Sequence, residues 1–171
     1  MNEFRLRQAN VSDAEGIAKV HVSTWQSTYS GLIPDSFLQS LNVEQRTKNW
    51  IRNLESSTPR NQTIVAEVDG EIVGFIGVGP SREIDNVNQG EVYAIYVDSK
   101  IQSQGVGTAL MRQGLLFLKD EKFGEAILWV LDKNSRTRQW YESLGWISLD
   151  KSKIDKRADF ELLEIQYAFK L

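Results

Sequence analysis

Two glycines stand between an apolar segment and a helical pattern, at a point where a phosphate group could bind. Residues 91–97 read E-V-Y-A-I-Y-V, which is typical of a strand, and a helical pattern extends from about Gly105 to Lys122. Gly105 and Gly107 leave little side chain between the backbone and a ligand. The first N–H groups of a helix are unpaired and carry a partial positive charge, so the junction could hold a phosphate. A plain tight turn explains these glycines equally well.

Two common phosphate-binding loops do not match this junction. A dinucleotide-binding fingerprint requires a third glycine at the position of Leu110. A nucleotide-triphosphatase loop requires Lys and then Ser or Thr after its last glycine, but Thr108 and Ala109 follow Gly107 here. The remaining pattern is Q-x-x-G-x-G, and it begins at Gln102.

This pattern resembles the R/Q-x-x-G-x-G/A signature of the GNAT superfamily of acyl-CoA-dependent N-acetyltransferases. Residues 134–146, N-S-R-T-R-Q-W-Y-E-S-L-G-W, are similar to that family's N-x-x-A-x-x-F-Y-E-x-x-G-F segment. Thr137 replaces the usual alanine and Trp140 the usual phenylalanine, which we interpret as packing changes. The stretch W-Q-S-T-Y-S-G-L-I-P also resembles the substrate-lid region of many small members. The likeness covers nearly the whole chain in the right order.

The resemblance implies which residues bind acetyl-CoA, the expected acyl donor. Backbone amides of the glycine loop would hold the pyrophosphate, the end of the preceding strand would pair with the pantetheine arm, and Asn134 would lie near that arm. Arg136 would contact a CoA phosphate or be a solvated helix charge. The expected CoA-binding residues are Ile95, Tyr96, Val97, Gln102, Ser103, Gln104, Gly105, Val106, Gly107, Thr108, Asn134 and Arg136.

Tyr141 and Glu91 are the expected catalytic residues. The resemblance matches Tyr141 to the family's frequent general acid, and Glu91 precedes Gln102 by the spacing that separates the general base from the loop in several members. Tyr141 would protonate the leaving thiolate, and Glu91 would accept the amine proton directly or through water. A backbone N–H near Val97 could polarise the thioester carbonyl. Direct transfer without an acyl-enzyme is implied by the resemblance.

Each of these side chains also has a purely structural explanation. Glu91 could begin a strand and pair with a cation, and Tyr141 could be an ordinary half-buried tyrosine. Asn134 is a natural helix N-cap and could serve in both roles. Trp25 and Tyr29 lie four residues apart on a predicted helix, so that core packing and lining of an acceptor pocket are both open.

Strand and helix patterns alternate around these residues. Residues 12–15 have the pattern of a capping box that opens a helix, and Asp69-Gly70 joins two strand patterns in a hairpin. Residues 79–90 read as a polar loop. We expect one α/β domain over residues 1–171 with a GNAT-like fold, in which about four helices flank a mixed, mostly antiparallel sheet of about seven strands.

The composition excludes several classes of function. The chain has 171 residues, a net charge of −3 and 41% apolar residues, which suits one globular domain without the basic face of a nucleic-acid-binding protein. No apolar run approaches the roughly 18 residues of a membrane span. With no cysteine and a single histidine, His21, only carboxylate metal sites stay open and no metal is expected. We expect a cytoplasmic protein.

The leading hypothesis is an enzyme that acetylates a primary amine of a small molecule, such as a polyamine, an aminoglycoside-like drug or an amino acid, or of a peptide or protein. The alternative is a non-catalytic domain of the same fold that senses acyl-CoA. A longer acyl group than acetyl also stays open. The resemblance and the long apolar C-terminal strands predict a homodimer.

Overall fold

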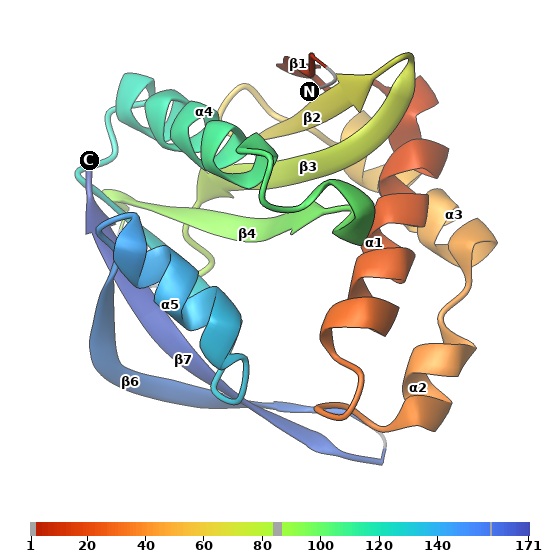
Figure 1. Ribbon diagram of the computed structural model, residues 1–171. Coiled ribbons are helices and arrows are strands. Elements are labelled where there is room, and N and C mark those ends of the chain that lie inside the picture. Colours follow the sequence, from red (N-terminus) through yellow and green to blue (C-terminus); the bar gives the residue numbers. More distant parts are fainter. Residues whose placement is uncertain (1–2, 84–86, 158) are drawn as a thin grey trace.

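A single mixed sheet organises the computed structural model, which describes residues 3–83, 87–157 and 159–171 (Figure 1). In space the strands follow the order β1-β2-β3-β4-β5-β7-β6. All neighbours are antiparallel except β4 and β5, which are parallel, so the predicted mixed, mostly antiparallel sheet is confirmed. The strands are β1 (Arg5–Gln8), β2 (Gln62–Val68), β3 (Glu71–Pro80), β4 (Gln89–Val97), β5 (Glu125–Leu131), β6 (Ile147–Lys156) and β7 (Glu161–Lys170).

Helices cover both faces of this sheet. The described residues form five α-helices, where about four were expected: α1 (Ala14–Thr28), α2 (Asp35–Ser40), α3 (Val43–Glu55), α4 (Val106–Asp120) and α5 (Ser135–Ser143). Short 3-10 turns, η1 (Val11–Asp13) and η2 (Ser99–Ile101), precede α1 and follow β4. Figure 1 shows α4 and α5 on the face toward the viewer, with α1 and α3 at the other side of the sheet. Within the described residues, none of these helices is both long and apolar enough to cross a membrane.

Side chains of β2 and β3 alternate between the two helical layers. Ile64 and Ile76 are buried in the core shared with α4 and α5, whereas Val65 and Phe75 are buried against α1 and α3. Successive residues of a strand point to opposite faces, and a sheet covered on both faces therefore needs apolar residues at successive positions. The β-type runs of the sequence have this composition because neither face of the central strands is exposed to water.

The parallel pair β4–β5 is short. Gln89 to Val92 pair with Glu125 to Leu128, and the recorded pairing ends there. Tyr93 is an extra residue in β4, because Ala94 pairs with Gly77 and Val92 with Val78 on β3. Such a bulge bends its strand and increases its local twist. The C-terminal halves of β4 and β5 consequently diverge, and the loops that lead to α4 and α5 leave from the two sides of the opening.

The predicted hairpin at Asp69-Gly70 is confirmed. Asp69 has φ 51° and Gly70 has φ 85°, the left-handed values that a two-residue turn between right-twisted strands requires at both positions. The predicted polar loop is too long at both ends, because Pro80 pairs with Gly90 at the end of the β3–β4 ladder. Proline lacks a backbone donor and is tolerated at the end of a strand, so its presence did not mark the boundary of the loop.

The predicted capping box is displaced by two residues. The box is formed by Asn10 and Asp13 around the η1 turn, where the Asn10 side chain accepts from the Ser12 backbone and Asp13 accepts from the Asn10 N–H at 2.8 Å. Asp13 is buried and also binds both terminal nitrogens of Arg7 at 2.7 and 2.8 Å. The helical turn therefore begins before Ser12, because Arg7 of strand β1 binds the carboxylate of Asp13.

The close contact of α4 with β3 predicts a steric limit at Gly114. A Cβ at this position would lie 2.7 Å from Cδ1 of Ile76 and 3.0 Å from Cγ1 of Val78. Gly114→Val should lower the free energy of unfolding by roughly 1–3 kcal/mol through overpacking. Urea unfolding measures this difference, with Gln113→Val on the exposed side of the same helix as the control. Equal midpoints for the two variants would contradict a tight contact.

The partly buried ring of His21 predicts a loss of stability in acid. Burial, together with the charge of Arg46, lowers the pKa of His21 from 6.5 to about 3. Between these values the unfolded chain binds a proton that the folded protein does not, so the free energy of unfolding should decrease as the pH falls, by at most about 1.4 kcal/mol per unit. Urea unfolding at a series of pH values measures the slope.

His21→Asn is the matched variant for this measurement. Nδ1 of His21 accepts a hydrogen bond of 3.3 Å from the Trp50 indole, and an asparagine oxygen can take over that acceptor position without gaining a proton. The variant should lose less stability than the wild type between pH 6.5 and 4. Parallel curves would show that His21 does not carry the pH dependence.

Candidate active site

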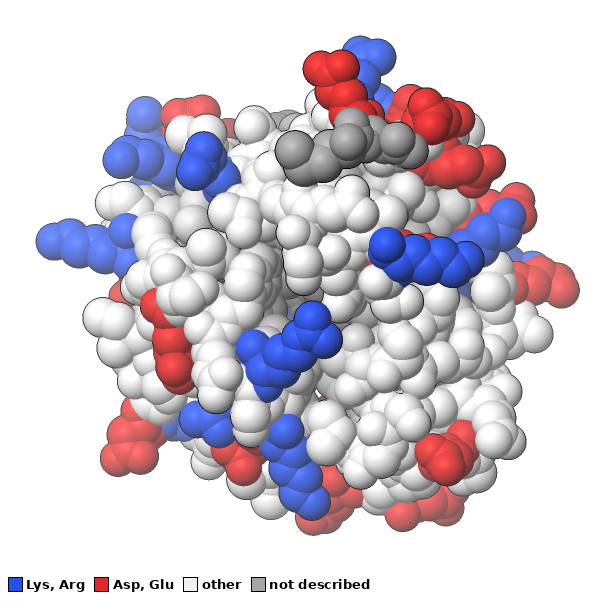
Figure 2. Space-filling model, in the orientation of Figure 1, with Lys and Arg blue, Asp and Glu red and all other residues white. Residues whose placement is uncertain are grey.

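A cavity of about 850 Å³ lies where β4 and β5 diverge. Its walls come from the C-terminal halves of these two strands, the start of α4, α5, one side of α1 and the β6–β7 pair. Figure 2, in the orientation of Figure 1, shows a hollow near the middle of the face that carries α4 and α5, with a basic side chain beside it. Small-molecule sites in open α/β sheets favour such positions outside the carboxyl ends of strands.

The glycine loop turns the chain sharply into α4. Ser103 and Gly105 both have left-handed backbone conformations, with φ 66° and 85°, and Nε2 of Gln102 donates to the Val97 carbonyl at 3.2 Å. No side chain in the described part of the protein caps α4, and its first turn contains no acidic residue. By contrast, asparagine side chains cap α3 and α5. The N–H groups at the start of α4 therefore fit an anionic group such as a phosphate.

The far half of β4 offers one free edge to the cavity. Residues from Ala94 to Val97 pair with β3 on one side, whereas the recorded pairing with β5 ends at Val92. Ile95, Tyr96 and Val97, which are expected to bind CoA, all line the cavity. An unpaired strand edge presents backbone donors and acceptors that an extended ligand can use in the manner of an added strand.

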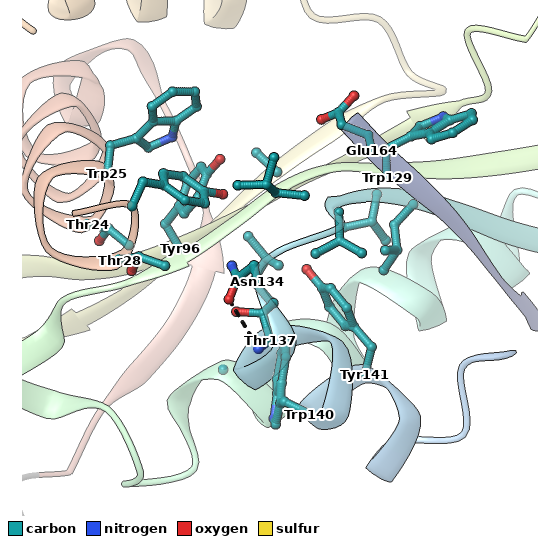
Figure 3. Close-up of a pocket in the computed structure, with 18 of the residues that line it drawn as sticks. Thr24, Trp25, Thr28, Tyr96, Trp129, Asn134, Thr137, Trp140, Tyr141 and Glu164 are labelled. Atoms are coloured by element: carbon teal, nitrogen blue, oxygen red, sulfur yellow. Dashed lines mark hydrogen bonds between the residues drawn. The ribbon is translucent and has the colours of Figure 1, made fainter. Parts of the chain in front are cut away.

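Tyr141 and Asn134 reach the cavity from α5. Tyr141 is 6% exposed, and its hydroxyl points into the space between β4 and β5 (Figure 3). Burial raises the pKa of Tyr141 well above 10, so the phenol keeps its proton at neutral pH. Asn134 accepts from the Thr137 N–H at 3.3 Å and so caps α5, which confirms the predicted N-cap (Figure 3). The side chain of Asn134 also lines the cavity.

Glu91 lies in the cavity wall with its carboxylate bound by Arg82. The side chain is 1% exposed, and Oε2 accepts from the Arg82 backbone N–H at 2.9 Å. Oε1 accepts from Nε of Arg82 at 3.1 Å and from a terminal guanidinium nitrogen. The Arg82 guanidinium also lies 5.1 Å from the centroid of the Tyr93 ring. The ion pair considered as the structural explanation for Glu91 is therefore present.

Aromatic side chains of α1 and β4 form the opposite wall. The rings of Trp25 and Tyr29 are 5.0 Å apart in an edge-to-face arrangement, and Tyr96 stacks on His21 at 4.9 Å. Trp25 and Tyr29 pack against a small core cluster and also line the cavity, so the expected core packing is present and contact with an acceptor stays a prediction. Burial raises the pKa of Tyr29 and of Tyr96, so these phenols are also protonated and can donate hydrogen bonds at neutral pH.

The cavity brings together all but two of the sequence-predicted site residues. Gln104 and Val106 are not in its walls, because the Gln104 side chain is exposed on the loop and the Val106 side chain is buried in the core below α4. The sequence analysis did not identify Arg82 or a set of cavity-lining residues on and next to strands β5, β6 and β7. The main members of that set are Trp129, Lys153, Asp155, Arg157 and Glu164. Their strands follow each other closely in the sequence, but only the strand order β5-β7-β6 brings these side chains to the cavity.

Comparisons with known proteins agree with this geometry. The acetyltransferase (GNAT) family model matches residues 23–146. The N-acetyltransferase YuaI of Bacillus subtilis is 35% identical over 129 residues, which cover 75% of this chain and 72% of that protein.

Two solved structures share the fold over nearly their whole length. PaiA N-acetyltransferase from Thermoplasma acidophilum, in complex with coenzyme A, has a TM-score of 0.72 at 17% identity and covers 99% of both chains. Ribosomal-protein-alanine N-acetyltransferase from Brucella melitensis has a TM-score of 0.76 at 19% identity and covers 98% of this chain and 99% of that chain. The chain therefore belongs to the GNAT family of acetyltransferases and is an N-acetyltransferase.

Proposed function

We propose that this protein transfers the acetyl group of acetyl-CoA directly to a primary amine of a small molecule, or of a peptide or protein. The observation that carries the proposal is the placement of the Tyr141 phenol, which is protonated and faces the same cavity as the free edge of β4 and the uncapped start of α4. A thioester held along β4 then has an acid for its leaving sulfur.

The residues that would hold acetyl-CoA follow from this placement. The backbone N–H groups at the start of α4 suit the pyrophosphate, and the free edge of β4 suits the amide groups of the pantetheine arm. The Asn134 side chain lines the same cavity as that edge, and Arg136, exposed on the first turn of α5, is available to a phosphate. The cosubstrate supplies the activated acyl group, and the protein supplies position and electrostatics.

The chemistry then needs one proton donor and one proton acceptor. Tyr141 donates its proton to the sulfur as the bond to the acetyl carbon breaks. A backbone N–H near Val97 stabilises the carbonyl oxygen. Glu91 receives the proton of the attacking amine through water, on the lone pair of Oε2 that the three hydrogen bonds from Arg82 leave open. Arg82 thereby fixes the orientation of the carboxylate.

Two other expectations from the sequence stay predictions. A homodimer is supported by the edge strand β6, where Ile147 and Ile154 are 69% and 55% exposed. A cytoplasmic location is compatible with a chain that contains no cysteine.

Replacement of Tyr141 tests catalysis. Tyr141→Phe should reduce kcat by about a hundredfold or more, because it removes the proton of the general acid and leaves the ring in place. The KM for acetyl-CoA should change little. Thiol release from acetyl-CoA across a panel of amines measures both constants. An unchanged kcat in Tyr141→Phe would exclude Tyr141 as the acid. If the wild type bound CoA tightly but acetylated no amine of the panel, the alternative of an acyl-CoA sensor would be favoured.

Replacement of Gly105 tests the phosphate site. Gly105→Ala should raise the KM for acetyl-CoA by about tenfold, because a Cβ at φ 85° costs roughly 1–2 kcal/mol and shifts the amides that face the cavity. Gly70→Ala is the matched control: Gly70 has the same φ, and a Cβ at either glycine would meet no atom within 4 Å. Both variants should lose similar stability in urea unfolding. Only Gly105→Ala should change this KM, and an equal KM for the two variants would place the CoA phosphates elsewhere.

A further inference from the structure

An ammonium group of the protein itself lies on an aromatic ring in the cavity wall. Nζ of Lys153 lies 4.2 Å from the centroid of the Trp129 ring and 3.5 Å from a carboxylate oxygen of Glu164. All three residues line the cavity, and Figure 3 shows Trp129 and Glu164 on the wall across from Trp25 and Tyr96. An aromatic face beside a carboxylate is a chemical environment that binds organic cations.

The strand register explains why these residues meet. Lys153 pairs directly with Glu164 across β6 and β7, and Glu164 pairs with Leu131 across β7 and β5. Directly paired residues place their side chains on the same face of a sheet, and Trp129 shares that face with Leu131 because it lies two residues away. The cation, the ring and the carboxylate therefore form one continuous surface, with buried Leu131 and Leu162 beside them.

The carboxylates of the cavity differ in how firmly they are held. Glu91 accepts from the backbone and the guanidinium of Arg82, and Asp155 accepts from Arg157 at 2.6 Å. Glu164 pairs with Lys153 at a separation that exceeds a normal charged hydrogen bond, and it also interacts electrostatically with the more distant Arg82. The Lys153 side chain is 42% exposed on the edge strand, next to an irregularity in the β6–β7 pairing between Ser148 and Ser152. A ligand cation can displace it.

We infer that Trp129 and Glu164 form a subsite for a second ammonium group of the acceptor, and that the acceptor is a small aliphatic diamine or polyamine. Lys153 occupies this subsite until the acceptor replaces it. The inference rests on the proposed function, since the reacting amine must lie near Tyr141 and β4. β7 is two strands away from β4 in the sheet, which corresponds to roughly 10 Å or more, because β4 and β5 diverge at this end. An extended alkyl chain along Leu131 and Leu162 bridges this separation between the two amines.

A second ion pair of the same two strands supplies matched controls. Lys156 pairs with Glu161 across β6 and β7, and its Nζ lies 3.7 Å from a carboxylate oxygen of that residue. The pair is an odd number of residues from Lys153 and Glu164, so it lies on the other face of the strands, and neither residue is part of the cavity wall. Glu161→Gln and Lys156→Ala thus make the same charge changes as Glu164→Gln and Lys153→Ala, on the same strand pair but outside the subsite.

The experiment compares diaminoheptane with heptylamine on the full chain, because an extended seven-carbon chain is long enough to place its two nitrogens at the two sites. Calorimetric titration into CoA-saturated protein measures binding, and thiol release from acetyl-CoA measures KM and kcat. The wild type should prefer the diamine by about tenfold, the magnitude expected from a cation–aromatic contact plus a charge pair. Glu164→Gln should abolish this preference and leave the binding and turnover of heptylamine unchanged. Lys153→Ala should strengthen diamine binding, because it removes the internal competitor, whereas both control variants should retain the wild-type preference.

The outcomes separate the inference from the proposed function. Turnover of both amines without preference for the diamine would overturn the inference and support the acetyltransferase activity. Equal weakening of both amines by Glu164→Gln would also overturn it, as would unchanged diamine binding in both Glu164→Gln and Lys153→Ala. If diamine binding depends on Glu164 but no amine is acetylated, the subsite is supported and the proposed function fails.

Discussion

The short parallel contact between β4 and β5 is the constraint on which the site depends. The recorded pairing covers Gln89 to Val92 on β4, and the extra residue Tyr93 then bends that strand away. β7 pairs with the other edge of β5 over the full length of that strand. β4 keeps β3 on its other edge. The sheet therefore stays continuous at one end and opens at the other, so that a cavity reaches between two central strands.

The cavity between β4 and β5 has two sides that suit different ligands. The start of α4 and the α5 residues Asn134 and Tyr141 lie on the side that suits a phosphate-bearing thioester. Trp25 of α1 and Glu164 of β7 lie on the side that suits an amine. Two ligands that approach from opposite sides can meet at the gap without passing through the core. This arrangement supports the proposed direct transfer, because two ligands bound in this way would hold their reacting groups close together without a protein nucleophile.

Burial sets the protonation of the groups around the gap. It raises the pKa values of Tyr29, Tyr96 and Tyr141, and it lowers that of His21, so each of these side chains is uncharged at neutral pH. The charged groups of the amine side form pairs, with Arg82 on Glu91 and Lys153 on Glu164. A cationic acceptor thus meets a surface whose charges are already balanced, and it binds by exchange with an internal cation rather than by adding a charge.

The sequence by itself determined the features that depend on a few neighbouring residues. The hairpin at Asp69-Gly70, the N-cap at Asn134 and the glycine loop before α4 were predictable, because backbone conformation and local hydrogen bonds act within one turn of chain. The family resemblance added the placement of Tyr141. The capping box at the start of α1 was predicted two residues late, since Asp13 is held by Arg7 of another element.

Only the tertiary structure decided which distant side chains share the cavity. The register of β6 on β7 puts Lys153 opposite Glu164, and the strand order puts both beside Trp129. A shift of one residue in that register would turn these side chains to the other face. The ion pair between Arg82 and Glu91 likewise depends on the β3–β4 register, which pairs Glu91 with Gly79 at the end of β3. Strand register is set by the packing of the whole sheet, and no short segment of the sequence carries that information.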